Sequence, residues 1–167
     1  DEKEEKQAKL NNNFWDNASV YFVIPDRFYN GNPDNDESYG REKAKSKNSQ
    51  DDCGKFYGGD IAGLTKKLDY LKDLGVTTIY LNPISMANSG HKYDTADYMK
   101  VDDNFGGEAA LRELIHKASA LGISIILDGV FNHTGADSVY FNKFNHYTIT
   151  FKKVDNKYIF DNIKKEN

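Results

Sequence analysis

The sequence predicts an α/β fold built around parallel strands. The segments LGVTTIYL (74–81) and LGISIILD (121–128) share one pattern, in which Leu-Gly is followed at once by an apolar strand. Each segment follows a stretch with apolar residues at spacings of three and four, which is typical of an amphipathic helix. Apolar strands that alternate with helices favour a parallel sheet covered on both faces, in either a doubly wound or a barrel fold.

The first expected strand is VYFVI (20–24), which is rich in β-branched and aromatic residues and is bounded by Pro25. A helix is then expected after Asp60, which is a good N-cap, and before Gly75, which suits the position just past a helix end. Its apolar face is formed by Ile61, Leu64, Leu68, Leu71 and Leu74.

The second strand is expected at 76–84 and the third at 123–131. The helix between them ends just before Gly122. Its apolar positions are Leu111, Leu114, Ile115, Ala118 and Leu121.

The two ends of the chain differ from this middle part. Residues 1–13 are rich in acids and lysines, and we expect a disordered tail or linker there. Residues 134–167 mix Tyr, Phe, Lys and Asn without a helical period. Within them, 147–154 is expected to be a strand, followed by a turn at 155–156 and a second strand from Tyr158.

Composition excludes several classes of function. The 167 residues include 22 basic and 26 acidic side chains, so the net charge is −4, which gives no basic footprint for a nucleic-acid partner. No run has the apolar length of a membrane span. Cys53 is the only cysteine, so an internal disulfide is impossible.

Polar residues follow each expected strand, where ligands of parallel α/β proteins bind. Asp26 follows the first strand, Asn82 the second, and Asp128 lies in the third segment with Asn132 and His133 after it. Polar residues also simply end strands, so each of them alone is a weak signal.

A second cluster of oxygen ligands lies in a loop at 30–60. Asn30, Asn32, Asn35 and Asp36 place four side-chain oxygens within seven residues. Gly58 could add a carbonyl and Asp60 a carboxylate, which together suit the six to eight oxygen ligands that calcium prefers. The alternative is an Asn/Asp/Gly-rich turn without an ion.

Four segments together resemble a known family. These are VYFVIPDRFYNGNPDND (20–36), FYGGDIAGLTKKLDYLKDLGVTTIYLNPI (56–84), HKYDTADY (91–98) and DGVFNH (128–133). In this order and spacing, over about residues 14 to 143, they resemble the α-amylase family of glycoside hydrolases, which includes secreted amylases, cyclodextrin glucanotransferases and periplasmic amylases.

The resemblance implies the N-terminal portion of a (β/α)8 TIM barrel. Residues 14–133 would hold about three β/α units, and residues 134–167 would begin the domain inserted after strand 3. A complete barrel takes about 250 residues. We therefore expect a fragment of a retaining hydrolase or transglycosylase that acts on starch or maltodextrin. The family's catalytic carboxylates lie on later strands, so the fragment alone should be inactive, and its open sheet edges favour an oligomer.

The resemblance also assigns roles to individual residues. Tyr93 would stack on the sugar ring at the cleavage subsite, and His133 would bind the same sugar through a hydrogen bond. Asp128 would support the catalytic centre without being the nucleophile. His91 would also contact substrate, although Lys92 follows it where the family usually has Gly.

The calcium loop resembles that of the cyclodextrin glucanotransferase branch, where the first ligand is usually Asp and here is Asn30. Asn132 matches a ligand of another calcium ion, which lies between barrel and inserted domain. An extracellular or cell-envelope location is expected. Two alternatives remain: a non-catalytic glucan-binding or partner subunit of the same family, and a stand-alone calcium-stabilised carbohydrate-binding module.

Overall fold

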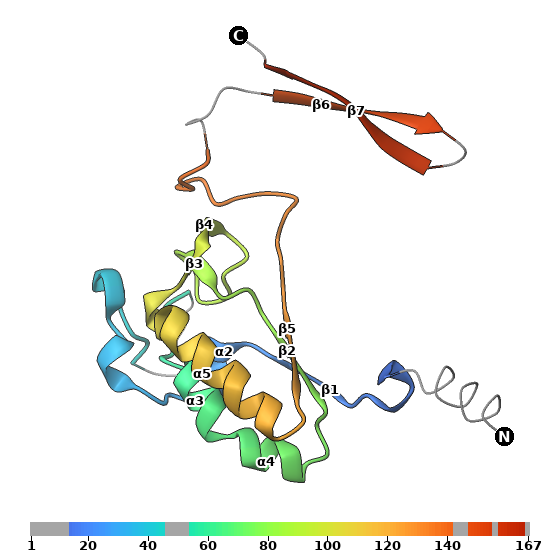
Figure 1. Ribbon diagram of the computed structural model, residues 1–167. Helices are drawn as coiled ribbons and strands as arrows, with labels where there is room; N and C mark the ends of the chain where they lie inside the picture. Colours follow the sequence, from blue (N-terminus) through green and yellow to red (C-terminus); the bar gives the residue numbers. More distant parts are fainter. Residues whose placement is uncertain (1–13, 46–53, 142–146, 155–156, 166–167) are drawn as a thin grey trace, which may run out of the picture.

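The computed structural model describes residues 14–45, 54–141, 147–154 and 157–165. The expected tail at 1–13, Cys53 and the expected turn at 155–156 therefore lie outside the described residues. Figure 1 shows the order of the elements along the chain.

A parallel sheet confirms the predicted α/β class. β1 (Val20–Val23), β2 (Thr78–Leu81) and β5 (Ser124–Leu127) pair in parallel in the order β1-β2-β5. In register, Tyr21 lies beside Ile79, which lies beside Ile125. Each strand is shorter than its expected segment, and β1 ends just before Ile24 and Pro25, the residues that lead into the next helical turn.

The helices that connect these strands are α3 (Ile61–Lys66), α4 (Leu68–Asp73) and α5 (Gly107–Ala120). The expected N-cap is confirmed, because the Asp60 side chain accepts a hydrogen bond from the Gly63 N–H. The expectation of one continuous helix after Asp60 is wrong, since Lys67 leaves helical geometry with φ −104° and ψ 7°. The Thr65 hydroxyl donates to the Ile61 carbonyl at 2.9 Å, a bond that often bends helices.

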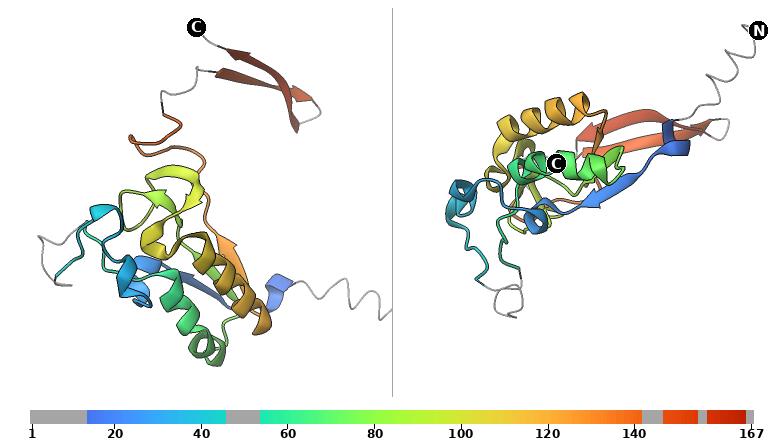
Figure 2. Two further views of the ribbon diagram at one scale, coloured as in Figure 1. Left: turned by 60° about the vertical axis from the view of Figure 1, so that its left-hand side comes forward. Right: turned by 90° about the horizontal axis from the view of Figure 1, so that it is seen from below.

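The three helices lie along one face of the sheet (Figure 2). The buried core between them is formed by Val23, Ile61, Leu64, Leu68, Leu71, Val76, Ile79, Leu81, Ile84, Phe105, Leu114, Ala118 and Ile123. The predicted helix faces are thus largely confirmed, although Leu74 and Ile115 are exposed. The expectation that helices cover both faces of the sheet is wrong, because the helices lie along one face only (Figure 2). Val20 and Phe22 of the edge strand β1 are about half exposed.

Two antiparallel pairs complete the described strands. β3 (Ser85–Ala87) pairs with β4 (Thr95–Val101), a pair for which the sequence pattern predicts no strand. β6 (Tyr147–Val154) pairs with β7 (Lys157–Lys165), which confirms both strands expected near the C-terminal end. Short helical turns are η1 (Phe14–Asn17), α2 (Pro25–Phe28), η2 (Pro33–Asn35), η3 (Ser38–Gly40) and η5 (Asp103–Phe105). Within the described part of the chain, no helix has the length and apolar character needed to cross a membrane.

Candidate functional site

The carboxyl ends of the three parallel strands place polar residues side by side. The Asn82 N–H donates to the Val23 carbonyl at 3.0 Å, and the Asp128 N–H donates to the Leu81 carbonyl at 3.1 Å. The ladder therefore continues one residue past β2 and past β5. This fixes the backbones of Asn82 and Asp128 at the same edge of the sheet, as the sequence predicts.

Tyr93 reaches this edge from the loop between β3 and β4. Its hydroxyl donates to Asp128 Oδ2 at 2.9 Å and lies 3.4 Å from Asn82 Oδ1. The hydrogen bond to the Asp128 carboxylate raises the pKa of Tyr93. The Tyr93 residue is still 37% exposed. A ring held at its hydroxyl end and open to solvent can offer a face to a ligand.

His91 is held next to Tyr93 through its backbone and its ring. The Asn82 side-chain amide donates to the His91 carbonyl at 3.0 Å, and the Tyr93 N–H donates to His91 Nδ1 at 3.1 Å. Because Nδ1 accepts, the neutral ring carries its proton on Nε2. The His91 and Tyr93 ring centroids are 5.9 Å apart. Nε2 can therefore act as a donor beside the tyrosine ring.

His133 and Asn132 lie farther along the same loop. Their side chains contact each other, with 2.7 Å between Asn132 Nδ2 and His133 Nδ1. Among the described contacts, none joins the His133 ring to Tyr93 or Asp128. The backbone after β5 lies against β4 instead, where the Tyr98 hydroxyl is within hydrogen-bond distance of the Val130 and His133 carbonyls and can donate its one proton to either. The structure thus brings together three of the four predicted substrate contacts and leaves His133 apart.

Asp26 supports the site from the end of β1. It is 2% exposed and accepts hydrogen bonds from the Tyr57 N–H at 2.9 Å and from Arg27 Nε at 3.0 Å. Burial raises the pKa of Asp26. A Cβ on Gly90 would lie 2.8 Å from Asp26 Oδ2, so the Tyr93 loop packs closely on this carboxylate. The sequence marked Asp26 as a strand-end residue but not as a support for the loop.

The expected calcium loop brings its predicted residues close together. Asn30 Nδ2 donates to Asp36 Oδ1 at 2.7 Å, and the Lys43 ammonium pairs with Asp36 Oδ2. Gly58 packs against the same carboxylate, because a Cβ there would lie 2.6 Å from Asp36 Oδ1. Asn32 has a local role, since its side chain accepts from the Asp34 N–H and caps η2. No group of three or more His, Cys, Asp or Glu suited to a metal occurs within the described residues.

Asp60 is the most strongly bound member of this loop. Its Oδ1 accepts from the Gly31 N–H at 2.9 Å and from the Gly63 N–H at 2.6 Å. Its Oδ2 accepts from the Asn32 N–H at 2.9 Å and from Asn35 Nδ2 at 3.0 Å. A carboxylate has about four acceptor positions, and here N–H donors occupy them. Asp60 therefore closes the loop onto the start of α3.

Two oxygens of the loop remain unpaired although they are buried. Asn30 Oδ1 and Asn35 Oδ1 have no hydrogen-bond partner. A buried acceptor without a partner costs about 1–3 kcal/mol and needs an explanation, of which a bound ion is one. Amide and carboxylate oxygens are the ligands that calcium prefers. The donor chemistry of Asn30, Asn35 and Asp36 thus fits a calcium ion.

Comparisons with known proteins point to one family of enzymes. The family model described as "Alpha amylase, catalytic domain" matches residues 22–166. An amylopullulanase of Thermoanaerobacterium saccharolyticum is 44% identical over 159 residues, which cover 81% of this chain and 12% of that protein. The periplasmic α-amylase of Escherichia coli is 43% identical over 136 residues, which cover 72% of this chain and 20% of that protein. The solved type III pullulan hydrolase of Thermococcus kodakarensis superposes with a TM-score of 0.66 at 40% identity, over 73% of this chain and 24% of that one.

Proposed function

Because the chain belongs to the α-amylase family, we propose that it forms the sugar-binding N-terminal part of a retaining enzyme that hydrolyses or transfers α-1,4-linked glucans. The parallel sheet and its helices are then the first part of a (β/α)8 barrel. The chain spans about 12% of the amylopullulanase and 20% of the periplasmic α-amylase. We therefore assign the glucan-cleaving activity to a larger protein of which this chain is a part. The observation that carries the proposal is the hydrogen bond between Tyr93 and Asp128 at the strand ends, 2.9 Å long.

The proposed binding mode uses each of these residues differently. The apolar face of a pyranose ring stacks on Tyr93, whose hydroxyl is kept in place by Asp128. His91 donates from Nε2 to a sugar hydroxyl. His133 would bind the same sugar through a hydrogen bond, which requires the segment after β5 to move toward Tyr93, away from the Tyr98 hydroxyl that contacts the His133 carbonyl.

The bond-breaking step is assigned to residues outside this chain. Retaining glycosidases use two carboxyl groups about 5–5.5 Å apart, one as nucleophile and one as acid and base. Asp128 already accepts the Tyr93 hydroxyl, which suits a supporting carboxylate rather than the nucleophile. We therefore assign no catalytic residue within 1–167.

A calcium ion is proposed for the loop at 30–60. Asn30, Asn35 and Asp36 would bind it through side-chain oxygens, and Gly58 through its carbonyl. The ion would pair the two buried amide oxygens and bind Asp36 alongside or in place of the Lys43 ammonium, so its contribution is structural. Asn32 and Asp60 would shape the loop around it. Asn132 is proposed as a ligand of a separate ion only when further residues join it.

An extracellular or cell-envelope location is also proposed. Its support is the family membership and the similarity to a periplasmic α-amylase. Calcium is also abundant outside the cell, where a loop with few charged ligands could still be occupied.

The test is hydrolysis of maltoheptaose by the natural full-length protein. We expect release of reducing sugar, with the α-anomer as the first product by NMR, and a loss of activity in a Tyr93→Ala variant. Binding of the oligosaccharide without cleavage would instead favour the non-catalytic glucan-binding subunit. An initial β-anomer would contradict the retaining mechanism.

A further inference from the structure

Lys92 combines two unfavourable features in one residue. Its side chain is 0% exposed, and charged side chains are almost never fully buried unless they are paired. Its backbone lies in the left-handed region with φ 65°, which favours glycine. Lys92 sits between His91 and Tyr93, so whatever holds it also sets the backbone of both predicted substrate contacts.

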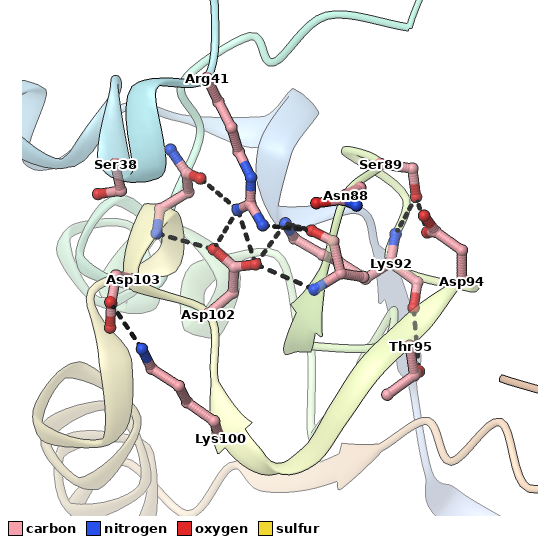
Figure 3. Close-up of polar contacts among 12 residues, drawn as sticks. Ser38, Arg41, Asn88, Ser89, Lys92, Asp94, Thr95, Lys100, Asp102 and Asp103 are labelled. Carbon is pink, nitrogen blue, oxygen red and sulfur yellow. Dashed lines mark hydrogen bonds and ion pairs between the residues drawn. The ribbon is translucent and has the colours of Figure 1, made fainter. Parts of the chain in front are cut away.

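A buried cluster compensates for both features (Figure 3). Lys92 Nζ donates to Asp102 Oδ2 at 2.7 Å and to the Ala87 carbonyl at 3.1 Å. Arg41 Nη1 lies 2.8 Å from each oxygen of the same carboxylate. The Lys92 ammonium also lies 4.5 Å from the ring centroid of Phe56. The lysine is therefore anchored to β3 and to the residue that precedes η5.

The Lys92 charge is not needed to neutralise Asp102, because Arg41 already pairs with that carboxylate. Asp102 faces two cations, and burial lowers the pKa of Lys92 to about 8 even though Asp102 raises it. Arg41 lowers that pKa and Asp26 raises it. Without the lysine ammonium, Arg41 and Asp102 would remain an ion pair of zero net charge, 2.8 Å apart. The core therefore does not require the Lys92 charge, and its role must be sought in the loop.

The loop around Lys92 is fixed at several points. The Lys92 N–H donates to the Ser89 hydroxyl at 3.1 Å, and the Ser89 hydroxyl donates to Asp94. The Tyr93 N–H and hydroxyl make the contacts to His91 and Asp128 already described. The Lys92 side chain connects this turn to the protein interior, where Nζ donates to Asp102 and to the Ala87 carbonyl.

The same cluster extends to the candidate calcium loop. Asn104 accepts from Arg41 Nη1 at 2.5 Å. Its side-chain amide donates to the carbonyls of Asn35 and Asp36, at 2.9 Å each. One set of buried hydrogen bonds thus joins the loop at 30–36 to the turn at 88–94.

We propose that Lys92 is a positioning residue that anchors the His91–Tyr93 turn and thereby holds the Tyr93 ring at the sugar-binding edge of the sheet. This role rests on the proposed glucan-binding function. Lys92 touches no substrate itself and acts through Tyr93. Its loss should loosen the turn while the sheet and helices stay folded.

Hydrogen exchange measures the anchor without any assay of activity. The natural full-length protein is compared with Lys92→Met, which keeps the apolar stem, and with Lys92→Gly, which suits the left-handed backbone. Lys100→Met is the matched control, because Lys100 also pairs with a neighbouring aspartate at 3.0 Å but is half exposed. We expect amides of 88–94 to exchange at least about tenfold faster in both Lys92 variants. The amides of α5 should keep their wild-type rates, as should every segment of the control.

Kinetics on maltoheptaose then test the consequence for the sugar. Misplacement of a substrate-contacting group can cost about 100-fold in rate, so kcat should fall by about 10- to 100-fold in Lys92→Met. KM should change less, because the remote glucose units still bind. The control should keep both constants.

Each outcome decides the matter. Wild-type exchange rates at 88–94 in Lys92→Met overturn the proposal, and so does normal kcat in a loosened turn. Wild-type exchange rates at 88–94 in Lys92→Gly also overturn it, even when Lys92→Met exchanges faster. A left-handed backbone at this position would then be enough to order the turn without a side-chain anchor. If the wild-type protein cleaves no glucan, the proposed function fails, whereas the exchange rates still decide whether Lys92 anchors the turn.

Discussion

Replacement of Asp60 by alanine is expected to free the loop at 30–36 from the start of α3. The substitution removes an acceptor from the N–H groups of Gly31, Asn32 and Gly63 and from the side-chain amide of Asn35. Each orphaned donor costs about 1–3 kcal/mol. Even the lower limit sums to about 4 kcal/mol of local stability, which corresponds to roughly 1,000-fold faster exchange of the amides involved.

Asp60→Asn is the matched variant, because it keeps the shape and one acceptor oxygen. The new NH2 group would face the Asn32 N–H and Asn35 Nδ2, both of which are donors. The Asn35 amide can rotate and present its unpaired Oδ1 instead, which leaves one unsatisfied N–H. We therefore expect a loss of about 1–3 kcal/mol, well below that of the alanine variant.

The assay is residue-resolved hydrogen exchange in the natural full-length protein, with α5 as the internal reference. A Gly63 amide that exchanges less than about tenfold faster in Asp60→Ala than in the wild type would show that Asp60 does not hold the loop. A second measurement separates support from ligation. If Asp60 only shapes the loop, Asp60→Asn should still gain melting temperature when calcium is added, but by less than the wild type, because rotation of the Asn35 amide takes one proposed ligand oxygen away from the ion. A complete loss of that gain, with local exchange unchanged, would make Asp60 a direct ligand.

Three further predictions follow from the site. Tyr93→Phe keeps the ring but loses a hydrogen bond to a carboxylate, so kcat/KM on maltoheptaose should fall about tenfold or more, and Tyr93→Ala should cost more; equal losses would argue against stacking. Calcium should raise the melting temperature and a chelator should lower it, and Asp36→Asn should weaken both shifts; no shift with either reagent would contradict the calcium site. Lys92 has a folded pKa of about 8 against an ordinary 10.5, so the unfolded chain binds more protons between these values and stability should rise with pH there, by at most about 3 kcal/mol. Melting curves of wild type and Lys92→Met between pH 7 and 10 check this, and parallel curves would disprove it.

Helix periodicity and capping could be predicted from the sequence because both are local. The spacing of Leu64, Leu68 and Leu71 placed them in the core, where each is at most 2% exposed. Asp60 caps α3, and Gly75 adopts φ 85° after α4 as expected. Leu74 fitted the same periodicity but is exposed, since the chain leaves the helix there before it reaches the sheet.

Non-local contacts account for what the sequence did not reveal. β3 is only three residues long and its register with β4 shifts twice, so neither strand shows a clean alternation. His133 lies in a strong motif, yet its backbone carbonyl contacts the Tyr98 hydroxyl, 35 residues earlier in the chain, which no local pattern predicts. Lys92 was noticed only as a departure from glycine, because its partners Arg41 and Asp102 are distant in sequence.

The position of Lys92 explains how a departure from the family pattern can preserve the site. Glycine at this point would allow the left-handed turn but would leave it without a side-chain hold. Lysine is strained in this left-handed backbone conformation, but its Nζ donates to Asp102 and to the Ala87 carbonyl and so holds the turn. Asn104 links the same cluster to Asn35 and Asp36, so one set of hydrogen bonds joins the turn that carries Tyr93 to the loop at 30–36.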